Sequence, residues 1–237
     1  MVTKIPLRAP REEWRAIGLV GVLFTLQIGL MNFGFAATTG TNGAVLIATN
    51  PLFALLFAHF LIPGDRIRPL RLLGASIAFA GTAFVLTRGA LSPPGGGWNT
   101  GDLIVLSSAA LLGLRLALSG RFLKSVNEVR LVFWMMLVSL PIFGVGGAVF
   151  ETILWDKVGW KVVCGIVYQG VVVAGLGFSV THYLIRRYTP SVMISFNFIS
   201  PVVGVALSIW ILGEPVVSSV LVGMVLVAVC LLLIARR

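Results

Sequence analysis

The chain of 237 residues is poor in charge, since only 11% of its residues are Asp, Glu, Lys or Arg. A soluble domain carries about 25% charged residues, so this composition excludes an ordinary soluble domain. The mean hydropathy of +1.02 agrees. Eighteen bases against eight acids give a net charge of +10. Because the bases lie between long apolar runs, they predict contact with a membrane surface and not with nucleic acid.

Cysteine and histidine are also scarce, with two residues of each. Cys164 and Cys230 both lie inside apolar runs, which predicts small core residues and disfavours a disulfide or a metal site. Neither histidine starts an H-E-x-x-H motif, and G-A-S-I at Gly74 departs from the G-x-S-G of rhomboid-type proteases. We therefore expect no catalytic residue, no metal and no cofactor, and disfavour an intramembrane enzyme.

Long apolar runs dominate the sequence. Each is about 17 to 24 residues long, which suits a tilted helix crossing a hydrocarbon core near 30 Å. Their continuous apolar character predicts helices, because isolated strands would leave backbone groups unpaired in lipid. The expected spans are eight: 15–36, 41–62, 70–86, 103–122, 131–150, 162–185, 191–212 and 218–235. The fold class predicted is an all-α integral membrane protein.

The distribution of bases predicts the orientation of these spans. Alternating connections place fifteen of the eighteen Lys and Arg residues on the side of the N-terminus, and only Arg88, Lys157 and Lys161 on the other. Basic loops face the cytoplasm in membrane proteins. Both termini are therefore expected to be cytoplasmic, in a multi-pass protein of the cell membrane.

An internal repeat relates the two halves of the chain. Pro51 and Pro201 each lie in the middle of an apolar run, and the two prolines are 150 residues apart. The glycine-led runs at Gly74 and Gly223 repeat at a spacing of 149. The two proline spans are the second and the seventh, so they cross in opposite directions. Inverted repeats are characteristic of secondary transporters, which bind substrate near mid-membrane.

Each proline lies in a block that ends in glycine and an acid: N-P-L-F-A-L-L-F-A-H-F-L-I-P-G-D from Asn50, and S-P-V-V-G-V-A-L-S-I-W-I-L-G-E-P from Ser200. A glycine-led helix follows each acid by nine residues. These blocks resemble EamA-type members of the drug/metabolite transporter superfamily. The resemblance implies ten helices in two sets of five. The first set here has three, so we expect that the first two helices of the family are absent.

The resemblance and the repeat together predict how the chain is divided. We expect a cytoplasmic lead-in over residues 1–14, a first repeat of three helices over 15–88, a Gly/Pro-rich loop over 89–101, and a second repeat of five helices over 102–237. The predicted function is transport of a small organic metabolite or drug-like solute by alternating access. The alternative is a non-transporting remnant or membrane assembly partner. Members of this family form dimers, so the resemblance also leaves open that this chain forms a homodimer.

Polar groups and prolines inside spans supply the candidates for a substrate cavity, because burying them in hydrocarbon is costly without partners or water. Each proline frees the carbonyl one turn earlier and so kinks its helix. Interhelical hydrogen bonding is the alternative role for the polar side chains. The candidates besides Arg115 are Asn50, Pro51, Gln169, Asn197, Ser200 and Pro201. Gln27 and Asn32 differ by about 140° around their helix, so both cannot face one cavity.

Arg115 is the most unusual candidate, because it lies between Leu114 and Leu116 inside an apolar span. Two interpretations stay open. Its side chain either snorkels to the cytoplasmic surface or faces the cavity and attracts an anionic group. His59 and His182 lie near cytoplasmic span ends, and we expect both at the surface.

Overall fold

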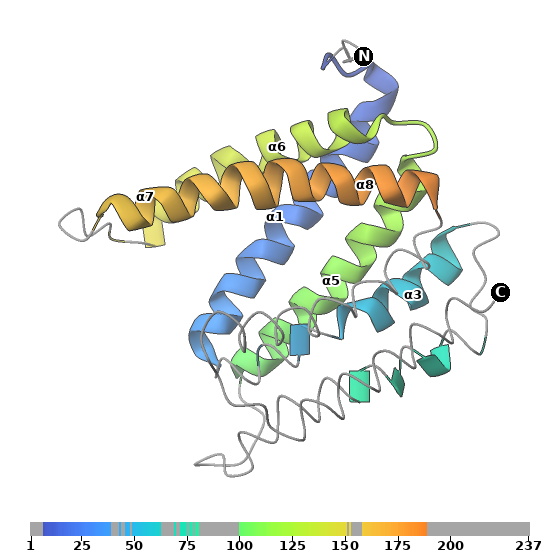
Figure 1. Cartoon of the computed structure of the whole chain (residues 1–237), viewed down its shortest axis with the longest axis horizontal. Helices are drawn as coiled ribbons and strands as arrows, with labels where there is room; N and C mark the ends of the chain where they lie inside the picture. Colours follow the sequence, from blue (N-terminus) through green and yellow to red (C-terminus); the bar gives the residue numbers. More distant parts are fainter. Residues whose placement is uncertain are drawn as a thin grey trace. The chain divides into compact units, whose positions relative to one another are not determined.

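The computed structural model describes residues 7–38, 43, 46–47, 49–62, 69, 72–74, 76–77, 79–80, 100–150, 152 and 158–188. Within these residues all regular structure is helical (Figure 1). A short 3-10 turn, η1 (Arg11–Glu13), precedes α1 (Trp14–Ala37). The chain then forms α3 (Asn50–Leu61), α5 (Thr100–Phe122), α6 (Glu128–Phe150), α7 (Trp160–Val167), the π-helical segment η3 (Tyr168–Gly177) and α8 (Phe178–Arg187).

The long helices follow the predicted spans closely. The described residues include four helices that are long and apolar enough to cross a membrane: Arg11–Ala37, Thr100–Phe122, Glu128–Val149 and Trp160–Arg187. The fourth joins α7, η3 and α8 without a break. Residues 72–74, 76–77 and 79–80, in the predicted third span, are helical as well. The predicted spans 191–212 and 218–235 lie outside the described residues.

Polar side chains define where two of these helices begin. Asn127 caps α6, since its Oδ1 accepts the backbone N–H of Val129 at 3.0 Å. Such a cap satisfies a donor that the first turn leaves without an intrahelical partner. Glu128 and Asp102 lie in the first turns of α6 and α5, where a negative charge suits the helix dipole. Both helices therefore start about three residues before their apolar runs.

The described contacts divide the chain into two units. Unit 1 contains Met1–Thr25 and Ser119–Tyr188, and unit 2 contains Leu26–Leu118 and Thr189–Arg237. In unit 1, α6 packs along α8 (Figure 1). Gly21 of α1 lies so close to α6 that a Cβ there would be 3.0 Å from Val138 Cγ1. The rings of Phe24 and Phe178 meet edge to face at 5.8 Å.

Ion pairs and aromatic contacts hold the helix ends of unit 1 together. The Arg130 guanidinium donates to both carboxylate oxygens of Glu13 at 2.7 Å, and Arg186 pairs with Glu128. The Trp134 indole N–H donates to the Leu7 carbonyl at 2.7 Å. The start of α1, the start of α6 and the end of α8 therefore meet in this unit.

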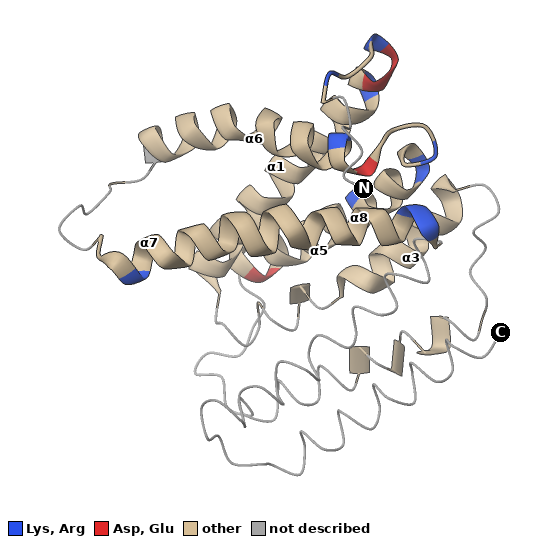
Figure 2. Cartoon of the chain, turned by 45° about the horizontal axis from the view of Figure 1, so that its top comes forward, with Lys and Arg blue, Asp and Glu red and all other residues tan. Residues whose placement is uncertain are grey.

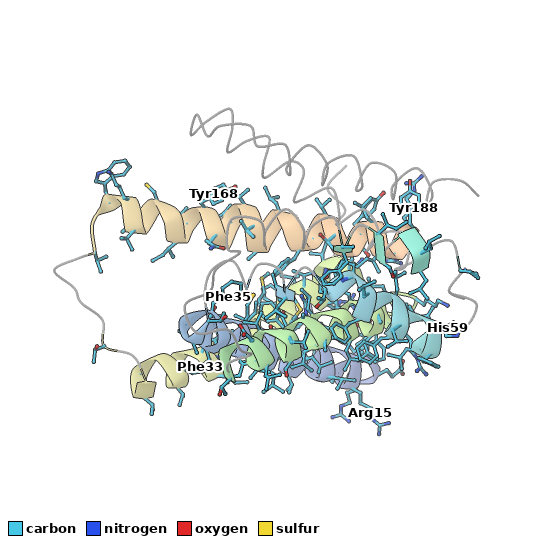
Figure 3. The ribbon with its side chains drawn as sticks, turned by 90° about the horizontal axis from the view of Figure 1, so that it is seen from below. Arg15, Phe33, Phe35, His59, Tyr168 and Tyr188 are labelled. Carbon is cyan, nitrogen blue, oxygen red and sulfur yellow. The ribbon has the colours of Figure 1, made fainter. Side chains whose placement is uncertain are left out.

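The same end of unit 1 is basic. Figure 2 shows blue residues around η1, near the start of α6 and at the end of α8. Arg15 points away from the helices (Figure 3) and is exposed. Other exposed bases here are Arg8, Arg11, Arg121, Lys124, Arg186 and Arg187.

In unit 2, α5 packs against both α1 and α3. The Thr38 hydroxyl donates to the Asp102 carboxylate at one end. Further along, a Cβ at Gly34 would lie 2.6 Å from Val105 Cγ2, so the two backbones are close. On α3, Ala58 and Ile62 form a buried cluster with Ala117 of α5.

The order of these contacts gives the helix directions in unit 2. Along α1, Gln27, Gly34 and Ala37 meet progressively earlier residues of α5, so α1 and α5 are antiparallel. Along α3, Ala54 meets Gly113 and Ala58 meets Ala117, so α3 and α5 run in the same direction.

Candidate functional site

The predicted proline span is interrupted beside Asn50 and Pro51. Leu46 and Ile47 are helical, Thr49 lies in a turn, and α3 begins at Asn50 with Pro51 in its first turn. The sequence predicted a kink inside one helix. The structure instead places the proline at the start of a new helix, where its fixed φ is favourable and its missing N–H costs little.

Side chains take up the carbonyl groups that this break leaves. In a continuous helix the carbonyl of Ile47 would accept the N–H of residue 51, which proline lacks. The Asn50 amide Nδ2 donates to that carbonyl instead, at 2.8 Å. The Thr49 hydroxyl donates to the Leu46 carbonyl at 2.6 Å. The prediction that proline frees a carbonyl is thus confirmed at Ile47, and Asn50 is its partner.

Asn50 also has one unused acceptor. Its Oδ1 is buried and has no hydrogen-bond partner among the described residues. A buried acceptor without a partner costs about 1–3 kcal/mol. The break therefore presents a buried amide oxygen at the start of α3.

A second set of buried polar residues connects α1 and α5. Gln27, Ser108 and Arg115 are 2%, 0% and 3% exposed, and we call them the interior polar group. The Ser108 hydroxyl donates to the Gln27 backbone carbonyl at 2.8 Å. Arg115 follows Ser108 by seven residues, so both lie on one side of α5, about 20° apart. Arg115 is thus inside unit 2, which favours the interior interpretation over snorkelling.

Gln27 is placed as the angle argument predicted. It is buried, whereas Asn32, five residues later on α1, is exposed. Gln27 and Gly34 are seven residues apart and share a side of α1. Because Gly34 packs against Val105, this side faces α5. The Gln27 amide has a weak contact with Met31 sulfur at 4.0 Å.

The other candidates belong to the other unit or lie outside the described residues. Gln169 lies in η3 in unit 1 and is exposed. Asn197, Ser200 and Pro201 lie outside the described residues. Their assignment to a substrate cavity stays a prediction.

The two histidines have different surroundings. His59 is exposed near the end of α3, as expected, and points outward (Figure 3). His182 is only 1% exposed, so its predicted surface position is wrong. Its Nδ1 lies 2.7 Å from the carbonyl oxygen of Phe178 one turn earlier. This backbone contact and packing in unit 1 place the ring inside.

Sequence reasoning missed Ser108 and the Thr38–Asp102 hydrogen bond. Ser108 is seven residues before Arg115, and this helical spacing was the available signal. Asp102 is 4% exposed although it is close to a helix start. No group of three His, Cys, Asp or Glu suited to a metal ion occurs among the residues that the structure describes.

A comparison with known families identifies the chain. The EamA-like transporter family matches residues 1–87 and 99–236, which is nearly the whole sequence. The chain belongs to the EamA-like transporter family. The four long apolar helices indicate a membrane protein, as the high mean hydropathy of the sequence does.

Relatives of this EamA-like chain include transporters of three bacteria. The uncharacterized transporter YvbV of Bacillus subtilis (strain 168) is 26% identical over 233 residues, covering 96% of this chain and 73% of the relative. An uncharacterized transporter of Clostridium kluyveri is 20% identical over 90% of this chain and 69% of its own length. The uncharacterized inner membrane transporter YedA of Escherichia coli (strain K12) is 26% identical, over 81% and 61%.

A solved crystal structure shares the fold of the EamA-like chain. Its TM-score is 0.76 at 20% sequence identity, and the match covers 97% of this chain and 77% of the other. At this identity the likeness concerns the fold alone.

Proposed function

We propose that this EamA-like chain moves small organic metabolites or drug-like solutes across the cell membrane by alternating access between two inverted repeats. The observation that carries the proposal is the burial of the interior polar group, above all Arg115, inside helices long enough to span a bilayer. Ionisable groups inside a membrane are costly and mark substrate or ion pathways. The transporter names of the relatives support the same function.

The proposed topology has eight spans with both termini in the cytoplasm. Two observations support it. In unit 2, α1 and α5 are antiparallel and α3 and α5 parallel, as expected for the first, second and fourth spans of an alternating series. In unit 1, exposed bases gather at one end, as expected of a cytoplasmic face.

The proposed cavity contains groups from both repeats. From the first repeat come Asn50 and Pro51, where the interrupted helix presents a buried amide oxygen. Interrupted helices next to a substrate site are common in transporters. From the second repeat come Gln169, Asn197, Ser200, Pro201 and Arg115.

Uptake by proteoliposomes tests this function. The purified full chain would be reconstituted, and uptake of tritiated L-threonine, tritiated uridine and the dye ethidium measured against protein-free vesicles. We expect at least one solute to enter faster with the protein, and Asn50→Leu to slow it. Vesicles in which no solute of the panel exceeds the protein-free rate would contradict the proposal and favour the non-transporting alternative.

A further inference from the structure

One exposed face of α1 changes from basic to apolar along the helix. Two arginines are followed by three apolar residues, and all five are exposed: Arg11, Arg15, Leu19, Val22 and Leu26. From Arg15 onward these side chains lie within about 60° of one another around the helix. Arg11 precedes Arg15 by about one helical turn. We call these five residues the outer face of α1.

The outer face points away from α6, which packs on the other side of α1. Glu13 pairs with Arg130 of α6, and Gly21 lies against Val138 of the same helix. Glu13 and Gly21 are about 160° and 120° around α1 from Arg15. Figure 3 shows Arg15 pointing away from the helices. Because α1 is long and apolar enough to cross a membrane, its outer face is suited to contact with lipid.

Two tryptophans indicate where the membrane surface meets this helix. Trp14 lies between the two arginines of the outer face, and its ring meets Trp134 of α6 edge to face at 4.7 Å. Tryptophan is enriched at membrane–water interfaces, where its ring lies at the level of the lipid headgroups. The arginines are therefore at headgroup level, and the apolar part of the outer face is at the level of the acyl chains.

The charges of Arg11 and Arg15 are not paired with an acid among the residues that the structure describes. The ion pairs at this end of unit 1 join Glu13 to Arg130 and Glu128 to Arg186. The remaining described acid at this end is Glu12, which is exposed and forms no ion pair there. Two guanidinium groups one turn apart, each with N–H donors in a planar fork, can both reach one phosphate group.

We propose that the outer face of α1 binds an anionic phospholipid such as phosphatidylglycerol. The lipid phosphate accepts hydrogen bonds from Arg11 and Arg15, and an acyl chain packs along the apolar residues below them. Phosphatidylcholine has the same phosphate, but its ammonium group cancels the negative charge. Under the proposed topology this end faces the cytoplasm, where the membrane surface is negative. The inference requires membrane insertion of α1 and does not depend on transport.

Native mass spectrometry of the purified full chain in a neutral detergent tests the inference. Phosphatidylglycerol and phosphatidylcholine with identical acyl chains are titrated in at equal concentrations, and the bound lipids are counted. We expect phosphatidylglycerol to be retained in preference to phosphatidylcholine. Equal retention of the two lipids would overturn the inference, because it would show that the negative charge is not recognised.

A double variant locates the site. Each base near an anionic membrane surface contributes about fivefold in affinity, so Arg11→Gln with Arg15→Gln should lower the apparent affinity for phosphatidylglycerol about twentyfold. The matched control is Arg121→Gln with Lys124→Gln, which removes two exposed bases from the same end of unit 1 but not from α1. We expect the control to keep its affinity. An equal loss in both double variants, or no loss in either, would contradict a site on α1.

A soluble competitor separates a lipid site from a site for free phosphodiesters. Glycerophosphoglycerol has the headgroup of phosphatidylglycerol without its acyl chains. We expect it not to displace the lipid at equal concentration, because it makes no contact with the apolar part of the outer face. Displacement would show that a free phosphodiester is the ligand and would overturn the lipid assignment. Lipid binding that depends on the two arginines supports the proposal whether or not the chain transports a solute.

Discussion

Gly113 sets how closely α3 and α5 approach each other. A Cβ at this position would lie 2.6 Å from the backbone nitrogen of Ala54 and 2.8 Å from Phe53 Cβ. The nearest atom is backbone, which cannot move aside like the end of a flexible side chain. Close helix contact at small residues is a main source of stability inside membranes.

Gly113→Ala is therefore expected to lower the free energy of unfolding by about 1–3 kcal/mol, the usual cost of overpacking. Gly29→Ala is the matched control, because a Cβ there meets nothing within 4 Å. Alanine is the better helix former, so the control gains up to about 1 kcal/mol. Thermal unfolding in detergent compares the two, and equal melting temperatures would contradict the packing argument.

The bond from Asn50 to Ile47 predicts an energetic coupling with Pro51. Asn50→Leu leaves the Ile47 carbonyl without its donor, which costs about 1–3 kcal/mol. Pro51→Ala supplies a backbone N–H that reaches the same carbonyl. In a double-mutant cycle, the pair of substitutions should cost at least about 0.5 kcal/mol less than the sum of the single ones. Additive losses would show that the two residues act independently.

At the scale of elements, two ion pairs join helix ends of unit 1 but differ in exposure. The Arg130 and Glu13 side chains are 11% and 13% exposed, whereas Arg186 is 46% exposed in its pair with Glu128. Water screens an exposed pair much more than a buried one.

Glu13→Gln should accordingly lower the free energy of unfolding by about 1–3 kcal/mol, because it leaves a partly buried guanidinium without its charged partner. Glu128→Gln should lower it by less than about 1 kcal/mol. Chemical denaturation in mixed micelles measures both. A larger loss for Glu128→Gln would reverse the proposed order of the two pairs.

The long helices could be predicted from the sequence because apolar length alone determines them. The predicted span 131–150 and the observed α6, Glu128–Phe150, end together. The prediction starts late because hydropathy ignores the polar first turn that Asn127 caps. The ten-residue π-helical segment η3 was not predicted, since α- and π-helices share the same apolar composition.

Prolines show the same limit of sequence reasoning. Pro51 stands at a helix start, whereas Pro141 lies inside α6 without ending it. The difference depends on neighbours. Two residues before each proline, a hydroxyl donates to the carbonyl three residues earlier: Thr49 to Leu46, and Ser139 to Met136. Directly before Pro51, the Asn50 amide donates to the Ile47 carbonyl, whereas Leu140 directly before Pro141 has no side-chain donor.

The candidate site was predicted only in part. Arg115 and Asn50 attract attention because polar groups in apolar runs are rare. Burial of Arg115 could not be derived, since its helix has apolar residues all around and periodicity gives no inward direction. Ser108 was missed because its partner is a backbone carbonyl 81 residues away in sequence.

At the scale of the whole molecule, the topology predicts opposite accessibility of two loops. Ser125 lies in the loop between α5 and α6, and Val158 lies just before α7, with α6 between them. Both are exposed. In a background with Cys164 and Cys230 changed to serine, Ser125→Cys should react with a membrane-impermeant maleimide only in inside-out vesicles. Val158→Cys should react only in right-side-out vesicles. Labelling of both from one side would contradict the proposed crossing by α6.

The π-helical segment has a consequence for bilayer thickness. Twenty-eight residues form the continuous helix Trp160–Arg187, and in ideal α geometry they would reach about 42 Å, well beyond a hydrocarbon core of about 30 Å. The hydrogen bonds of a π-helix span five residues, which widens the coil and shortens it per residue. A longer or shorter π-segment therefore adjusts the reach of this helix without changing its tilt. Vesicles made from lipids of different chain length should shift the balance between π and α geometry over Tyr168–Gly177, which hydrogen exchange of these amides would report.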